Sequence, residues 1–229
     1  MNKTNKRRGG FYWLNGNPYV SVTQVIKVLS KPAIQYWFGQ QVYYAMVVDP
    51  SLSEKEALAS PYRKSKKAMK RGTTIHEMVE NYKKGAKLPE KFEGEKELVG
   101  YGNAFLSFLK DHPNFKALEH ERTVVNEGER YAGTLDIIGM VGDRKAIIDI
   151  KTNKNAAIYD EVDLQLSAYR AALGEDLPMF ALALGESGNY TFKQTENRYE
   201  EFLACKKLWE WKNNKKIIAV GYKSKEGEK

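Results

Sequence analysis

Residues 131–151, YAGTLDIIGMVGDRKAIIDIK, decide the fold of this chain. Two apolar runs in this stretch, residues 131–139 and 145–151, have the length and composition of β-strands, and the turn-forming Val141-Gly142-Asp143 separates them. Residues 118–125 form a third run of the same kind just before them. The stretch therefore predicts a three-stranded antiparallel meander.

Helical periodicity dominates on both sides of this meander. The spacing of apolar residues and the helix-terminating residues predict helices over residues 22–29, 34–48, 75–82, 95–110, 159–173 and 196–214, and further strands over residues 178–184 and 190–194. Ser51 or Ser53 is placed to cap another helical stretch. Near the N-terminus, Asn15-Gly16 between two short apolar runs predicts a β-hairpin, and Ser21 or Thr23 is placed to cap the helix that follows.

This order of elements predicts a mixed α/β fold in which helices flank a central mixed sheet. We expect a single domain in three parts: a mainly helical region over residues 1–115, the sheet and its helix over residues 116–195, and a C-terminal helix with a basic tail over residues 196–229.

The composition excludes several kinds of site. The chain has 229 residues, a net charge of +8 and a single cysteine, Cys205, which cannot build a disulfide framework, a four-thiolate zinc site or a four-thiolate iron–sulfur cluster. No apolar run is long enough to span a membrane, and the basic N-terminus leads into Phe11-Tyr12-Trp13 rather than into the apolar stretch of a signal peptide. We expect a soluble, cytoplasmic protein with an anionic partner such as nucleic acid.

Two acids interrupt the most apolar strands. Asp136 and Asp149 lie within them, and a buried carboxylate is costly unless it is paired or binds a metal. A hard dication, Mg²⁺ or Mn²⁺, bound by Asp136, Asp149 and the carbonyl of Ile150 would resolve this conflict. Lys151, two residues after Asp149, leaves the same face of the strand and would help to activate water. The alternative is a salt bridge between Asp136 and Lys151, with Asp149 facing solvent.

Three further polar residues are candidates for the same site. Gln165 and Tyr169 are four residues apart and share a helix face, although an exposed Gln165 beside a buried Tyr169 explains the pattern as well. His76, predicted near the start of a helix, is either a structural residue or an imidazole ligand, which would favour Mn²⁺.

Four of these segments, taken in order, resemble the motifs of the RecB-like branch of the PD-(D/E)xK nuclease superfamily. They are Arg71-Gly72-Thr73-Thr74-Ile75-His76, Gly133-Thr134-Leu135-Asp136, Asp149-Ile150-Lys151 and Gln165-Leu166-Ser167-Ala168-Tyr169. The segments Ser21-Val22-Thr23-Gln24-Val25 and Lys31-Pro32-Ala33, with Trp37, are also similar to phage-type and mitochondrial single-strand exonucleases of that branch. The resemblance covers about residues 20 to 175 and implies a restriction-endonuclease-like core.

The resemblance also implies roles for the residues. Asp136, Asp149 and His76 would be metal ligands, Lys151 the catalytic lysine, and Gln165 with Tyr169 the pair that positions the active site and the DNA backbone. Leu135 stands where the superfamily has proline, and the cysteines that hold an iron–sulfur cluster in some relatives are absent, so we expect no cluster. The candidates for the additional carboxylate that some relatives carry are Glu121, Glu77 and Glu80.

Two groups of residues are candidates for binding DNA. One is a run of six cations that leads into the His76 motif, Arg63, Lys64, Lys66, Lys67, Lys70 and Arg71, which forms either a phosphate-binding surface or a solvated helix face. The other is the aromatic cluster Tyr36, Trp37, Phe38, Tyr43 and Tyr44, most of which we expect in the core, although such rings also stack on unpaired bases.

We therefore expect a metal-dependent DNA exonuclease that acts on single strands or on DNA ends, in the recombination, repair or processing of phage or mobile-element DNA. Its partners would be DNA and a recombination protein, and no membrane. The alternatives are a structure-specific endonuclease of the same fold and a non-catalytic DNA-binding subunit of a recombination complex.

Overall fold

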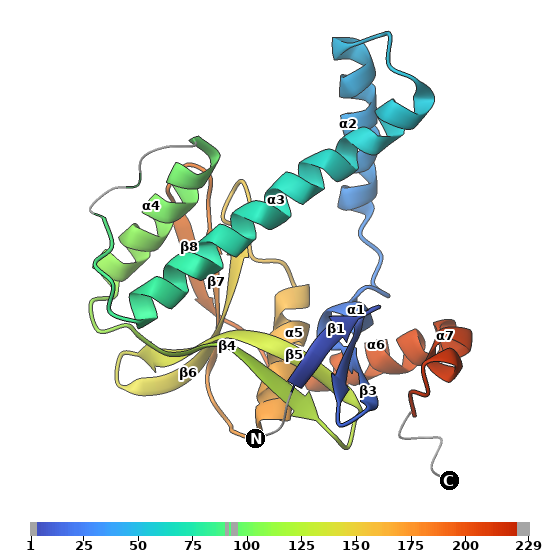
Figure 1. Ribbon diagram of the computed structural model, residues 1–229. Helices are drawn as coiled ribbons and strands as arrows, with labels where there is room; N and C mark the ends of the chain where they lie inside the picture. The colour runs from blue at the N-terminus through green and yellow to red at the C-terminus, as the bar shows by residue number, and fades with distance from the viewer. Residues whose placement is uncertain (1–3, 90–91, 93–95, 224–229) are drawn as a thin grey trace.

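The computed structural model describes residues 4–89, 92 and 96–223, without the side chains of residues 4–8, 67–71 and 96–97. Its centre is an eight-stranded mixed sheet. Three of its strands, β4 (Lys116–Asn126), β5 (Tyr131–Val141) and β6 (Arg144–Thr152), pair antiparallel in chain order (Figure 1). The predicted meander is thus confirmed.

The N-terminal hairpin extends the same sheet. It consists of β1 (Thr4–Arg8), β2 (Phe11–Leu14) and β3 (Asn17–Ser21). Asn15 and Gly16 both have positive φ, 49° and 80°, as a two-residue type I′ turn requires, and this confirms the predicted hairpin. Strand β1 was not predicted from the sequence, and β3 joins the sheet by pairing parallel to the start of β5.

The other edge of the sheet is built through a helical crossover. After β6, the chain passes through α5 (Glu161–Leu173) into β7 (Met179–Leu184), which pairs parallel to β6, and β8 (Tyr190–Gln194) then pairs antiparallel to β7. Helix α5 ends at Gly174, whose φ of 73° is the left-handed conformation that terminates helices.

Helices cover both faces of the sheet. Those that contribute to the first core are α1 (Val22–Ile26), α5, α6 (Tyr199–Lys212) and α7 (Asn214–Ala219), while α3 (Glu54–Lys83) and α4 (Lys96–Asp111) contribute to the second. Buried side chains such as Leu166 and Phe202 fill the first core, and Phe105 and Phe108 fill the second. This arrangement is the predicted mixed α/β fold and is consistent with a restriction-endonuclease-like core. Within the described ranges, no helix is both long and apolar enough to cross a bilayer.

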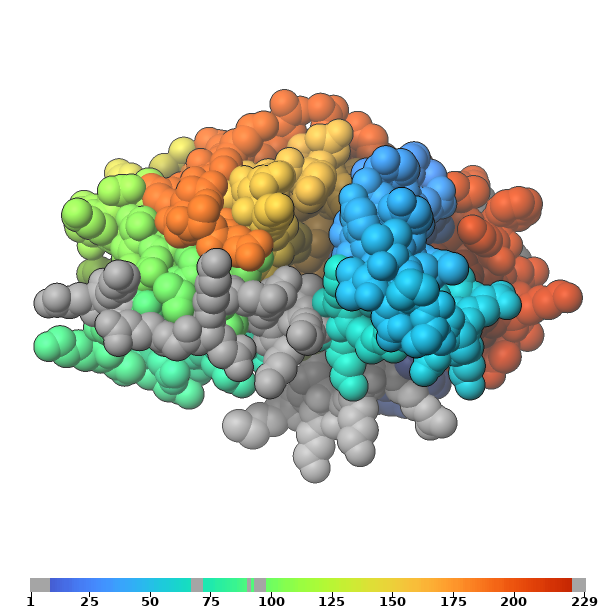
Figure 2. Space-filling view, turned by 90° about the horizontal axis from the view of Figure 1, so that it is seen from above, coloured from blue at the N-terminus to red at the C-terminus, as the bar shows by residue number. Residues whose placement is uncertain are grey.

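Helix α2 (Pro32–Val48) and the start of α3 project from this body as a helical hairpin (Figure 1). Figure 2 shows α2, in blue, against the cyan surface of α3. The expectation that most of the aromatic cluster is core is wrong, because Tyr36, Tyr43 and Tyr44 are 71%, 65% and 50% exposed. Only Trp37 and Phe38 are half-buried, since α2 has little besides α3 to pack against.

Helix α3 corrects a second prediction. It is one helix of 30 residues that begins with a capping box between Ser53 and Glu56, so the basic run and Gly72 lie inside it and His76 lies in its last third rather than near a helix start. Gly72 has a helical conformation, and Pro61 also lies inside the helix. Breakers of this kind predict helix ends, but tertiary packing overrides them here.

Candidate active site

The site lies where β5 changes its partner. On one edge, β5 pairs with β3 only at Tyr131 and Ala132, and with β6 only from Ile137 onward, which leaves residues 133–136 between the two ladders. The last pair of the second ladder is Ile137↔Ile148, so Asp136 and Asp149 are the next residues on the two strands. The predicted pair of acids therefore meets at a fork in the sheet.

The pleat of β5 is irregular around Asp136. Leu135 packs in the first core and Ile137 in the second, although residues two apart on a regular strand share a face. On β4, Glu121 occupies the position opposite Asp136, between the pairs His120↔Ile137 and Arg122↔Leu135, and it has a φ of 52°. Both strands thus lose their regular alternation beside the acids.

Asp149 is fully buried and is held by two side chains. Its Oδ1 accepts a hydrogen bond of 2.8 Å from Nε2 of Gln165. Its Oδ2 lies 2.5 Å from Nζ of Lys151 but accepts no hydrogen bond of good geometry. The alternative in which Asp149 faces solvent is therefore not observed, and its Oδ2 is engaged in an ion pair with Lys151.

Asp136 is held by the backbone of β6. Its Oδ2 accepts a hydrogen bond of 2.7 Å from the N–H of Ile150. Burial, and after it the charge of Asp149, raise the pKa of Asp136 to about 8. Because the N–H and C=O of a strand residue point to the same edge, the carbonyl of Ile150 also faces β5. Asp136 therefore lies against the backbone of Ile150 and close enough to Asp149 for the two carboxylates to repel each other.

Lys151 stays charged beside these acids. Burial lowers the pKa of the ammonium, but Asp149 and Asp136 outweigh that effect, and the net result is a raised pKa. Its Nζ also donates a hydrogen bond of 3.2 Å to Oε1 of Gln165. About a third of the Lys151 side chain remains exposed to solvent.

Gln165 and Tyr169 form the support behind the acids. Gln165 donates from Nε2 to both Asp149 and the Tyr169 hydroxyl, the latter at 3.0 Å. Tyr169 is buried, and burial followed by the charge of Asp149 keeps its pKa well above the usual range, so the hydroxyl is neutral. Its ring lies over Gly133, where an added Cβ would come within 2.3 Å of Cε1. Gly133 is therefore required by this close approach.

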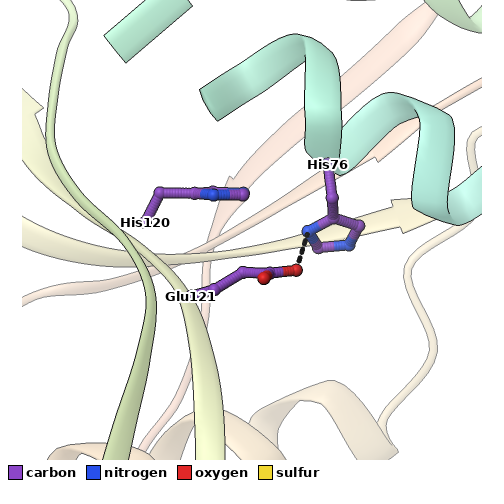
Figure 3. Close-up of side chains that lie close together, drawn as sticks. All are labelled: His76, His120 and Glu121. Carbon is purple, nitrogen blue, oxygen red and sulfur yellow. Dashed lines mark ion pairs between the residues drawn. The ribbon is translucent and has the colours of Figure 1, made fainter. Parts of the chain in front are cut away.

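His76 faces β4 from helix α3. Its Nδ1 lies 3.8 Å from Oε1 of Glu121, and its ring centroid lies 5.7 Å from that of His120, a residue that the sequence analysis did not single out (Figure 3). Burial, and then the neighbouring His120, lower the pKa of His76, which keeps the imidazole neutral as a metal ligand must be. The charges of Asp149 and Lys151 also affect the pKa of His76, so the imidazole lies within electrostatic reach of the acid pair.

The three candidates for an additional carboxylate occupy different places. Glu121 lies opposite Asp136 and contributes to its raised pKa. Glu80 is engaged by Lys84 and by Nδ1 of His120, at 3.2 and 3.1 Å. Glu77 is exposed and lines a cleft beside α3. Glu121 is thus the candidate that directly borders the acid pair.

The basic run follows α3 toward the site. Arg63, Lys64 and Lys66 lie on its projecting part, where Lys64 donates a hydrogen bond of 2.5 Å to Oε1 of Gln41. The next residue after the run is Gly72, where a Cβ would lie 3.9 Å from Oγ1 of Thr152, next to Lys151. The side chains of the remaining members, Lys67, Lys70 and Arg71, lie outside the described residues.

No protein-family model and no curated protein matches this sequence. Among solved structures, the chain is similar to that of a "Putative exonuclease" from Eubacterium rectale, with 14% identity and a TM-score of 0.48 over 88% of this chain and 80% of the other. It is also similar to SSO0001, with 12% identity and a TM-score of 0.39 over 93% of this chain and 79% of the other. Neither likeness bears on the chemistry of the site, which rests on the geometry described above.

Proposed function

We propose that this protein is a metal-dependent deoxyribonuclease that hydrolyses phosphodiester bonds from DNA ends or along single strands. The observation that carries the proposal is the convergence of Asp136, Asp149 and Lys151 at one fork of the sheet, supported by Gln165 and Tyr169. Two acids and an ammonium, held by a buried hydrogen-bond network, are the groups that phosphodiester hydrolysis needs.

The donor set fits a hard dication. Oδ2 of Asp149 contacts only the ammonium of Lys151, and Asp136 carries a raised pKa because it is buried beside Asp149. An ion held by these two carboxylates and the carbonyl of Ile150 would relieve that repulsion, and oxygen ligands favour Mg²⁺ or Mn²⁺. When bound, such an ion supplies Lewis acidity and lowers the pKa of water.

Lys151 acts on the reacting phosphate. The oxygen of a water molecule forms a bond to phosphorus and releases one proton to solvent. The bond from phosphorus to the leaving sugar oxygen breaks, and that oxygen keeps the electron pair and takes up a proton from solvent. The ammonium of Lys151 orients the water and offsets the negative charge that develops on the phosphoryl oxygens. Gln165 holds Asp149 and Lys151 in register, since it bonds to both.

Features of α2 and α3 support DNA as the substrate. The basic run on α3 leads to the end of β6, and the exposed tyrosines of α2 lie on the same projecting hairpin. Cations bind phosphates of any sequence and aromatic rings stack on unpaired bases, so this surface suits a single strand. The proposed setting is the recombination, repair or processing of phage or mobile-element DNA.

Digestion of end-labelled DNA with added Mg²⁺ or Mn²⁺ tests this proposal. Asp149→Asn and Lys151→Ala should each lower the rate by at least about 100-fold, because each removes a group that acts on the transition state. Both variants should still bind DNA. Asp143→Asn, in the exposed turn after β5, is the matched control and should retain full activity. Full activity in either site variant would refute the proposal.

A circular single strand separates the remaining alternatives. An exonuclease leaves the circle intact and degrades its linear form, whereas an endonuclease cuts both. A protein that binds both forms but hydrolyses neither, with either metal, would be a non-catalytic DNA-binding subunit.

A further inference from the structure

A second cluster of ligand-type side chains lies between α3 and β4. Among the described residues, the only group of three His, Cys, Asp or Glu side chains whose ligand atoms all lie within 4.8 Å of one another is His76, His120 and Glu121. Figure 3 shows His76 reaching down from α3 toward Glu121, with the ring of His120 beside them. Asp136 and Asp149 are not members of this group.

Two buried nitrogens in the cluster have no hydrogen-bond partner. They are Nδ1 of His76 and Nε2 of His120, and the His120 side chain is only 4% exposed. A buried polar atom left unpaired costs on the order of 1–3 kcal/mol, so such atoms point to a missing ligand. The separation of 3.8 Å between His76 and Glu121 is too long for a hydrogen bond but suits two ligands on one ion.

The surroundings orient His120 as a ligand. Oε2 of Glu80 lies 3.1 Å from Nδ1 of His120, which leaves Nε2 as the free nitrogen. A carboxylate on the far nitrogen is the usual support of a metal-binding histidine. The positive φ of Glu121 has a related effect, since consecutive strand residues normally point to opposite faces and here His120 and Glu121 both reach His76.

We propose that His76, His120 and Glu121 form a binding site for a transition-metal dication of the zinc or manganese type, distinct from the all-oxygen pair Asp136 and Asp149. Two imidazoles and one carboxylate form a three-ligand set that leaves a position open, and nitrogen ligands favour Zn²⁺ strongly over Mg²⁺. The cluster lines a cleft of about 770 Å³, which gives an ion and one further ligand access. A bound ion would join helix α3 to strand β4. The proposal does not depend on the nuclease activity.

Titration of the metal-free full-length chain with Co²⁺ in the presence of excess Mg²⁺ tests this site. We expect one equivalent to bind saturably and to produce the visible absorption of a histidine-bound Co²⁺ ion, and Zn²⁺ should displace it. His120→Ala and Glu121→Gln should abolish this absorption. His112→Ala, which replaces the third histidine of the chain, and Asp149→Asn should retain it.

Glu80→Gln provides a variant that removes no ligand. It should weaken Co²⁺ binding by about 10-fold or more, because the support of His120 is lost. The proposal is overturned if the wild-type chain binds no stoichiometric Co²⁺ in excess Mg²⁺, if the absorption survives His120→Ala, or if Asp149→Asn removes it. Failure of hydrolysis with an intact Co²⁺ signal would instead refute only the nuclease proposal.

Discussion

The surroundings of Asp136 oppose the ionisation of its carboxyl group. The folded pKa of about 8 lies above the usual value of a free aspartate, so between about pH 4 and pH 8 the unfolded chain has lost a proton that the folded chain keeps. The folded state then binds more protons, and its stability falls as pH rises through this window. Above about pH 8 both states are ionised and the loss is complete.

This fall in stability with rising pH gives a prediction for the metal-free protein. Asp136→Asn removes the titrating group but can still accept the Ile150 N–H, so its free energy of unfolding should fall less steeply between pH 5 and 8. At pH 8 to 9 the free energy of unfolding of the variant should exceed that of wild type by several kcal/mol, as measured by urea denaturation. Asp143→Asn should keep the wild-type slope. Identical slopes for Asp136→Asn and wild type would show that the pKa of Asp136 is not raised in the folded protein.

Gly133 gives a second prediction at this scale. Gly133→Ala would push a methyl group into the Tyr169 ring and should cost about 1–3 kcal/mol of stability. It should also slow hydrolysis, because Tyr169 is bonded to the glutamine that holds Asp149. Gly39→Ala on α2, where nothing lies within 4 Å, is the control and should be neutral or slightly stabilising. If Gly133→Ala/Tyr169→Ala is no less destabilised than the sum of the single variants, the clash is not the cause.

At the scale of elements, the α2–α3 hairpin makes its own prediction. Tyr36→Ala/Tyr43→Ala should leave thermal stability within about 0.5 kcal/mol of wild type, since both rings are exposed. Affinity for single-stranded DNA should fall by about 1–3 kcal/mol for each base that loses a stacking partner, as fluorescence anisotropy would measure. Trp211→Ala, on α6 and 77% exposed, is the control and should bind normally. Unchanged affinity of the tyrosine variant would remove α2 from the binding surface.

The sequence predicted most elements and part of the site. Local periodicity was sufficient for the meander, for α5 and for β8, and the two-residue alternation of strands correctly placed Asp149 and Lys151 on one side. The partner of β3 depends on residues more than 100 positions away, which no local pattern reports. His120 was missed for a physical reason: adjacent strand residues are expected on opposite faces, and the positive φ of Glu121 that brings both to His76 leaves no trace in the sequence.

At the scale of the whole molecule, the net charge of +8 predicts a strong salt dependence of DNA binding. Replacing Lys66, Lys67 and Lys70 with Gln should reduce the slope of log K against log salt by about 2 to 3, because each lysine neutralises one phosphate. The control is an equal charge change on α6 and α7, Lys207→Gln/Lys212→Gln/Lys215→Gln, where all three residues are exposed. Equal slopes in the two triple variants would show that the molecule attracts DNA only through its overall charge.

Helix α3 is unbroken between the projecting hairpin and His76. From Tyr62 to His76 it extends for about 20 Å, so a tilt of about 10° on the sheet would displace its outer end by some 3–4 Å. Between Tyr62 and His76 the helix has no proline, so a change in its tilt would move both its outer part and the imidazole. Under the proposed function, a DNA strand held on the α2–α3 hairpin and the position of the His76 imidazole would therefore depend on one and the same helix.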